Sequence, residues 1–327
     1  MINKKAIEIG FNVIFAIFAG VVILLLAIYG ATKIVTTGEK ASYTETSAKI
    51  ISLLDPLETG LASGKSSEIK FKKETKIFME CSSMENSPFG KQTISFSEQT
   101  FGENFGEKGG AVPFYNKYVF SQEVSQGKLF NIFSKEFLMP FKVADLIIIN
   151  TNDYCFVGAP NQIEKDITKN LGVENIKFAD SLQNCTGITV CFGAQSSECD
   201  IKVFGSCQDG GSNLCDTPYD YGRVSKGIND LYYVDSLLYA AIFSSPDIYD
   251  CNLKRLMNKF NELSLIYIDK IKIIERKGCG SDIEPSLRIL MNSAQNLSSS
   301  KEIIGLANYA KNINTINKAT ASACRLY

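Results

Sequence analysis

Near its N-terminus the chain carries a long, almost uninterrupted run of apolar residues. Residues 11–35 contain only one amide, one threonine and one lysine. About 20 apolar residues at 1.5 Å each cross the hydrocarbon core of a bilayer, and residues 11–31 alone reach that length. A cleaved secretory signal has a shorter apolar core of about 7–15 residues. The pattern therefore predicts an uncleaved signal-anchor, with a tip at residues 1–8 and a transmembrane helix over residues 9–36.

Residues 37–62 show apolar positions at steps of three and four, which is typical of an amphipathic helix with one buried stripe. The stripe consists of Tyr43, Ile50, Leu54, Leu57 and Leu61, with Ser47 completing its register. Proline kinks a helix interior but suits a first turn, so Pro56 predicts a kink or restart at Asp55. We expect the anchor and this stalk to form one long helix whose outer half packs on the ectodomain.

Residues 63–225 contain short runs rich in β-branched and aromatic residues, bounded by Gly, Asn, Asp and Ser, which predict strands. One pair of runs predicts a hairpin that turns at Asn150 to Asp153. A helix is expected between Pro160, which suits a first turn, and Gly172, which suits the position after a helix end. The region reads as a small mixed β region with one helix, held by disulfides.

Residues 226–327 follow a helical period to the end of the chain. In the longest element Ser245 can cap, Pro246 takes the first helical position, and the helix is expected to end near Lys277. Its predicted stripe is Leu253, Leu256, Phe260, Leu263, Tyr267, Ile271 and Ile274. The predicted fold class is α+β: a transmembrane and stalk helix, a disulfide-rich β region with one helix, and a C-terminal antiparallel helical domain.

The ten cysteines indicate either a metal site or disulfides, and all of them follow residue 80. They are Cys81, Cys155, Cys185, Cys191, Cys199, Cys207, Cys215, Cys251, Cys279 and Cys324. Structural zinc sites place cysteines two to four residues apart and often use histidine, whereas this chain has no histidine and no such knuckle. We therefore expect no metal site and no cofactor. Disulfides in an oxidising compartment are the better interpretation.

Helix geometry restricts the pairing of these cysteines. Cys251 and Cys279 are 28 residues apart in one predicted helix, about 42 Å along its axis, whereas a disulfide needs Cα atoms within about 7 Å. A simple antiparallel order brings the chain end back to the Cys279 end of this helix. The pattern predicts a Cys279–Cys324 disulfide and a bond from Cys251 to the β region, and leaves the other pairings open.

Charge around the apolar run gives almost no preference for orientation. Lys4 and Lys5 precede it, and Lys33 and Lys40 follow it, so the positive-inside rule is near a tie. The cysteine distribution favours a cytoplasmic N-terminus and an extracytoplasmic remainder. Asn184 and Asn296 each begin an N-x-[ST] triplet and are candidate glycosylation sites.

Composition excludes several classes of function. The chain has 34 basic and 35 acidic residues, so it lacks the excess of basic residues that is typical of a nucleic-acid binder. The absence of histidine removes Ser-His-Asp and Cys-His catalysis. Gly60 and Gly64 are separated by three residues, where a phosphate loop needs four. We expect no enzyme but a membrane-anchored structural or recognition protein, whose partners are the lipid bilayer and a second copy or another surface protein.

The stretch "MINKKAIEIGFN", the anchor, the stalk and the cysteine-rich β head together resemble archaeal pilin-like, single-pass surface proteins. The segments "YYVDSLLYAAIFSSPDIYDCNLKRLMNKF" and "CRLY" resemble uncharacterised archaeal membrane-anchored proteins. This resemblance implies a cell-surface location and brings no assigned activity. It also implies an alternative, a pilin-like subunit of a surface filament that is processed after Ala6. A histidine-independent extracytoplasmic enzyme is a further alternative.

Overall fold

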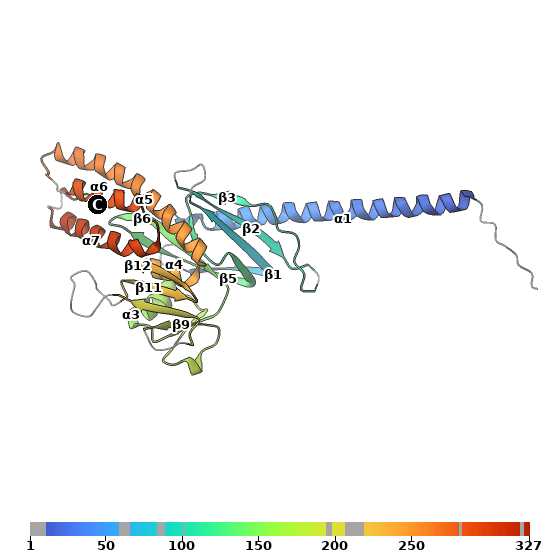
Figure 1. Cartoon of the computed structure of the whole chain (residues 1–327), viewed down its shortest axis with the longest axis horizontal. Coiled ribbons are helices and arrows are strands. Elements are labelled where there is room, and N and C mark those ends of the chain that lie inside the picture. Colours follow the sequence, from blue (N-terminus) through green and yellow to red (C-terminus); the bar gives the residue numbers. More distant parts are fainter. Residues whose placement is uncertain are drawn as a thin grey trace, which may run out of the picture.

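The computed structural model describes residues 11–58, 66–83, 89–100, 102–193, 198–206, 219–280, 283–320 and 324–327. The protein is α+β, with a long helix projecting from a head of two sheets and a group of helices (Figure 1). The predictions for the tip at residues 1–8 and for Leu61, Cys207 and Cys215 lie outside the described residues.

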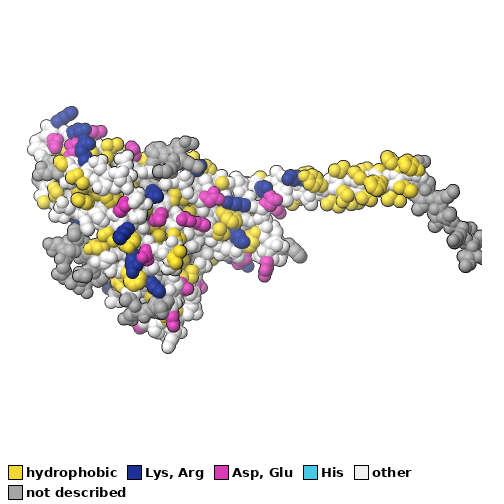
Figure 2. All heavy atoms as spheres, in the orientation of Figure 1, with side chains coloured by type: hydrophobic (Ala, Val, Ile, Leu, Met, Phe, Trp, Pro, Cys, Tyr) yellow, Lys and Arg dark blue, Asp and Glu magenta, His cyan; other side chains and the backbone are white. Residues whose placement is uncertain are grey.

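Helix α1 (Phe11–Leu53) is continuous over 43 residues, about 64 Å at 1.5 Å per residue. Its first part exposes large apolar side chains, and in the described chain it is the one helix long and apolar enough to cross a membrane (Figure 2). The later part buries one stripe, which consists of Tyr43, Ser47, Ile50 and, just beyond the helix end, Leu54 and Leu57. A short helix α2 (Asp55–Glu58) follows, so the predicted long helix and its restart at Asp55 are confirmed.

The first sheet has the strand order β3-β2-β1-β5-β6-β4. Its strands are β1 (Ser66–Ser82), β2 (Lys91–Glu98), β3 (Val112–Phe114), β4 (Tyr118–Phe120), β5 (Val124–Leu138) and β6 (Lys142–Asn150). Helix α1 packs on β2 and β3 of this sheet. Successive residues of β6 are buried in two different cores: Ile147 lies with the α1 stripe, and Ile148 lies with the C-terminal helices. Burial on both faces explains why residues 146–149 of β6 are all apolar.

The second sheet has the order β12-β11-β10-β9-β7-β8. Its strands are β7 (Tyr154–Val157), β8 (Ile176–Ala179), β9 (Ile188–Phe192), β10 (Ile201–Gly205), β11 (Tyr221–Lys226) and β12 (Asn229–Val234). Strands β7 to β10 are parallel, and β11 and β12 are antiparallel. A short 3-10 helix η2 (Leu182–Asn184) lies between β8 and β9.

The crossover from β7 to β8 is the helix predicted between Pro160 and Gly172. It consists of α3 (Asn161–Lys165) and a π-helical turn η1 (Asp166–Leu171). Pro160 is the N-cap, and Gly172 ends the turn with a left-handed φ of 67°. The prediction is confirmed, because proline and glycine mark these helix boundaries by their backbone preferences.

Two strand predictions are wrong. The hairpin at Asn150 to Asp153 does not form, because β6 belongs to the first sheet and β7 pairs in parallel with β8 and β9 in the second. The helical region also begins later than Lys226, since residues 229–234 form β12 beside β11. Local alternation identifies a strand but carries no information about which distant strand becomes its neighbour.

The C-terminal helices are α4 (Leu237–Phe243), α5 (Pro246–Glu275), α6 (Ile283–Gln295) and α7 (Ile303–Ala319), with a 3-10 turn η3 (Ser300–Glu302) before α7. All seven residues of α4 are buried, and this helix packs on β6, β11 and β12. Helices α5, α6 and α7 lie side by side in Figure 1. These helices share one hydrophobic core with both sheets instead of having a core of their own.

Four disulfides join eight cysteines of the described chain: Cys81–Cys251, Cys155–Cys185, Cys191–Cys199 and Cys279–Cys324. The Cys81–Cys251 bond connects β1 to α5, and the Cys279–Cys324 bond connects the end of α5 to the chain terminus. Both pairings that helix geometry predicted are therefore confirmed.

The loop after β2 approaches α1 through glycines. A Cβ atom at Gly109 would lie 2.8 Å from the Cβ of Tyr43 and 3.0 Å from the backbone nitrogen of Thr44. The Gly110 nitrogen donates to the Thr44 hydroxyl at 2.7 Å, and Lys40 forms an ion pair with Glu107. The stalk is thus held where the loop has no side chains to separate the two backbones.

Replacing Gly109 with alanine is expected to loosen the α1 contact, at a cost of about 1–3 kcal/mol from overpacking against the helix backbone. Limited proteolysis of the stalk and urea unfolding of the detergent-solubilised protein would measure it. The control is Gly38→Ala on α1, the helix that Gly109 contacts, where the new Cβ meets open space. Equal stability of the two variants would contradict the close-approach argument.

The disulfides that close the longest and the shortest loops among the four should differ in their effect on stability. The Cys81–Cys251 bond spans 170 residues and the Cys191–Cys199 bond spans 8. Loop-entropy arguments give a loss of about 5 kcal/mol for C81A/C251A and about 2.5 kcal/mol for C191A/C199A. Urea unfolding of the two double variants tests this order, and a reversed order would count against it.

Candidate functional site

A cavity of about 710 Å³ opens between the α3–η1 helix and the start of α4. Its lining begins with Pro160 to Gln162, directly after β7, and includes Tyr219, whose ring packs edge-on against Phe192, the last residue of β9. The cavity therefore lies at the carboxyl ends of two adjacent parallel strands. Chain connections leave β7 and β9 in opposite directions there, which is where open α/β sheets commonly bind ligands.

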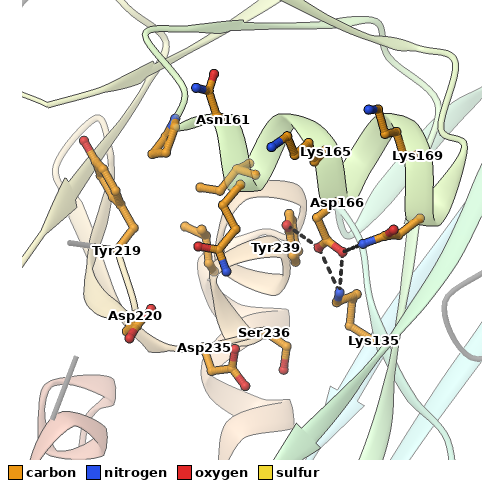
Figure 3. A pocket seen from close by; sticks show the side chains of 15 residues that line it. Lys135, Asn161, Lys165, Asp166, Lys169, Tyr219, Asp220, Asp235, Ser236 and Tyr239 are labelled. Carbon is orange, nitrogen blue, oxygen red and sulfur yellow. Dashed lines mark hydrogen bonds and ion pairs between the residues drawn. The ribbon is translucent and has the colours of Figure 1, made fainter. Parts of the chain in front are cut away.

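The floor of the cavity is a three-residue network from three separate elements. Lys135 of β5 donates to both oxygens of Asp166, at 2.9 and 2.8 Å, and the Tyr239 hydroxyl of α4 donates to Asp166 at 2.6 Å (Figure 3). Asn170 adds a weaker bond at 3.2 Å. Three donor groups make four hydrogen bonds to this carboxylate, and Lys135 balances its charge.

Local electrostatics fix the charge state of this floor. Burial by itself would raise the pKa of Asp166, but the hydrogen bonds and charge of Lys135 and the Tyr239 hydrogen bond outweigh it, so the pKa is lowered. Burial and the negative Asp166 raise the pKa of Tyr239 well above its ordinary value. Asp166 is thus ionised and Tyr239 protonated at neutral pH, and neither is suited to exchange a proton there.

The π-helical turn explains how Asp166 reaches the floor. Residues Asp166 to Leu171 form wider i to i+5 turns, which are rare and frequently found at functional sites. Figure 3 shows Asp166 directed down from this turn toward Lys135 and Tyr239.

The opposite wall is the turn between β12 and α4, together with Tyr219 and Asp220 (Figure 3). Asp235 has a left-handed φ of 46°, and its nitrogen donates to the Asp220 carbonyl oxygen at 2.6 Å. Aspartate is one of the few non-glycine residues that adopt this conformation readily. The Ser236 hydroxyl donates to the Glu136 carbonyl oxygen at 2.7 Å and fixes the turn against the first sheet.

Asp235 has the most perturbed carboxylate on this wall. Its side chain is exposed inside the cavity but surrounded by protein. Burial raises its pKa, Lys135 opposes this, and the neighbouring charge of Asp220 adds to the rise. Lys135, the cation that opposes the rise in the Asp235 pKa, is already bonded to Asp166.

The rim is formed by exposed polar side chains of the α3–η1 helix. Asn161, Lys165 and Lys169 lie on this helix at the mouth of the cavity (Figure 3). The whole lining contains three lysines and three aspartates, so it has no net formal charge. The arrangement offers many hydrogen-bond donors and acceptors without favouring an ion of one sign.

The structure also places the candidate sites that the sequence predicted. Asn184 in η2 and Asn296 after α6 are both exposed, as glycosylation requires. Cys191 and Cys199 are bonded to each other, which rules out a metal-binding role for that pair. Across the part of the chain that the structure describes, no group of three or more His, Cys, Asp or Glu residues could hold a metal ion.

No pattern in the sequence identifies the residues of the cavity as a site. Lys135, Asp166 and Asp235 are separated by dozens of residues and have no characteristic spacing. Asp166 lies inside the helix predicted between Pro160 and Gly172, and Asp235 lies in the segment predicted to be helical, so neither position indicates a site. Tertiary packing alone brings these side chains together.

Comparisons with protein-family models, with curated proteins and with solved structures give no match for this chain. The geometry of the long apolar helix α1 and of the cavity is therefore the basis for assigning a function.

Substitutions at the two aspartates should change stability in opposite directions near pH 7. The lowered pKa of Asp166 stabilises the fold above the ordinary aspartate pKa of about 3.9, and this contribution is lost as the pH falls below it. Asp166→Asn should cost about 1–3 kcal/mol near pH 7, because Lys135 loses its counter-charge. The raised pKa of Asp235 has the opposite sign, so Asp235→Asn should raise Tm near pH 7.

Thermal unfolding of both variants near pH 7 and near pH 3 measures these effects, and both differences from wild type should shrink at the lower pH. Asparagine also tolerates the left-handed backbone of position 235, so the comparison isolates the charge. A destabilised Asp235→Asn protein near pH 7 would contradict the assignment.

Proposed function

We propose that this protein is a membrane-anchored recognition protein that binds a small polar ligand in the cavity, on the extracytoplasmic side of the membrane. The observation that carries this proposal is helix α1. Its first part exposes a continuous apolar surface that water would not tolerate, and its last part is a structural component of the head. Insertion of residues 9–36 into a bilayer satisfies the exposed surface.

The disulfides support the side of the membrane on which the head lies. Disulfides persist in oxidising, extracytoplasmic compartments and are rare in the cytoplasm. All four bonds in the described chain lie in the head: one joins the first sheet to α5, one joins the end of α5 to the chain terminus, and two lie within the second sheet and its loops. A cytoplasmic N-terminus with an external head is the topology that this distribution favours.

The rigid junction between α1 and the head supports recognition at a fixed position above the membrane. The Lys40–Glu107 ion pair begins only five residues after Val35, about 7.5 Å along the helix. From there to α2 the helix is packed on the first sheet, where Lys117 bonds to both Asp55 and Glu58. The head is thus held close to the lipid headgroups with little freedom to swing.

The cavity favours binding over catalysis. Its one extensive network, Lys135–Asp166–Tyr239, is internally satisfied and has pKa values shifted away from neutrality. General acid–base catalysis needs groups whose pKa lies near the working pH. A lining of mixed donors and acceptors suits a ligand that is held without being transformed.

A second candidate is the pilin-like subunit of a surface filament. Helix α1 favours it, because one continuous helix combines an exposed apolar half with a half that is packed on a sheet. Electron microscopy of the purified protein and mass spectrometry of its N-terminus separate the candidates. Filaments together with a mature chain starting at Ile7 would support the pilin-like subunit, and an anchor retained in a protein without filaments would support the first proposal.

Thiol labelling tests the proposed location. Protein isolated from membranes, denatured without reduction and treated with maleimide-PEG should show almost no labelling, whereas reduction should expose ten thiols. In a separate experiment, external protease applied to intact cells should digest the head. Labelling of half the cysteines or more without reduction would contradict an oxidised extracytoplasmic head.

A further inference from the structure

We propose that the ligand of the cavity is a neutral carbohydrate, a short oligosaccharide bound through its hydroxyl groups. This inference rests on the proposed recognition function and specifies the substrate class of the same site. It follows from the distribution of charge in the lining, the placement of acceptors and donors, and the aromatic wall.

The charges of the lining are interspersed instead of being separated. Lys165, Asp166 and Lys169 alternate along one helix, and Lys135 neutralises Asp166 at the floor. An anion would meet Asp235, and a simple cation would meet the lysines of the rim. A neutral ligand avoids both repulsions.

Hydroxyl groups match the donors and acceptors of the two walls. Asp235 on the lower wall can accept hydrogen bonds from a ligand, and lysines and amides on the opposite helix can donate them. A hydroxyl both donates and accepts, so a polyol can satisfy both walls at once. Bonds to a carboxylate are the stronger ones, which makes Asp235 the principal anchor in this arrangement.

Tyr219 supplies the apolar surface that a sugar ring needs. Its ring forms one side of the cavity in Figure 3 and is held edge-on against Phe192 with the centroids 5.4 Å apart. The C–H face of a sugar can pack on such a ring while its hydroxyls reach the polar walls. The cavity volume of about 710 Å³ lies within the range of about 300–1,000 Å³ that is common for small-molecule sites.

The test uses the full-length protein in lipid nanodiscs, because glucoside and maltoside detergents would compete for the proposed site. Calorimetry measures binding of four neutral trisaccharides: maltotriose, cellotriose, mannotriose and N-acetylated chitotriose. Triglycine and tripolyphosphate serve as zwitterionic and anionic probes of similar size. We expect at least one trisaccharide to bind, with a Kd that changes less than twofold between about 50 and 500 mM NaCl, since its contacts are not ionic.

The variant Asp235→Asn should weaken trisaccharide binding about tenfold, through the loss of charge-assisted bonds. The matched control, Asp269→Asn, removes an equivalent charge from the exposed surface of α5 and should leave binding unchanged. Tm measured for both variants shows that each one is folded.

Three results would overturn the inference: binding of triglycine or tripolyphosphate without any trisaccharide, equal trisaccharide affinity in wild type and Asp235→Asn, or no binding of any probe. The first of these would retain the recognition function and change its ligand class. Failure of the proposed location would instead appear in the thiol-labelling experiment, which does not depend on any ligand.

Discussion

Burial of the first sheet on both faces is the constraint on which the rest of the structure depends. Its strands place alternate side chains in two cores, so that the adjacent residues Ile147 and Ile148 are both fully buried but contact different helices. Helix α1 must cover one face, and α4 with α5 must cover the other. Because apolar surface is costly in water, the sheet needs both α1 and the C-terminal helices in place.

A buried cation joins these parts at the edge of the sheet. Arg255 of α5 is fully buried, and its guanidinium lies over the ring of Tyr118 with 4.8 Å to the centroid. It donates to five oxygens: the carbonyls of Phe89, Tyr115 and Lys117 and the side chains of Gln92 and Asn252. The three carbonyls belong to the loops before β2 and β4, so one side chain ties these loops to α5. The Cys81–Cys251 bond secures the same helix one turn earlier.

The cavity is a consequence of how the two sheets meet. Helix α4 is apolar on all sides and lies between the two sheets. Its first residues and the turn before it therefore lie where the α3–η1 crossover faces the first sheet. Polar side chains from four elements converge there, and the neutral Lys135–Asp166–Tyr239 network closes the floor. Since α1 is packed on the same sheet that carries Lys135, the position of the cavity relative to α1 is set by the fold itself.

Local periodicity and distance along one helix were enough to predict several features of the fold. These are the long α1 with its break at Asp55, the helix between Pro160 and Gly172, and the Cys279–Cys324 pairing. The tertiary structure alone decided the assignment of β6 and β7 to different sheets and the assembly of the cavity. Strand partners and cavity walls are chosen by contacts between residues far apart in the chain, and such contacts leave no regular spacing in the sequence.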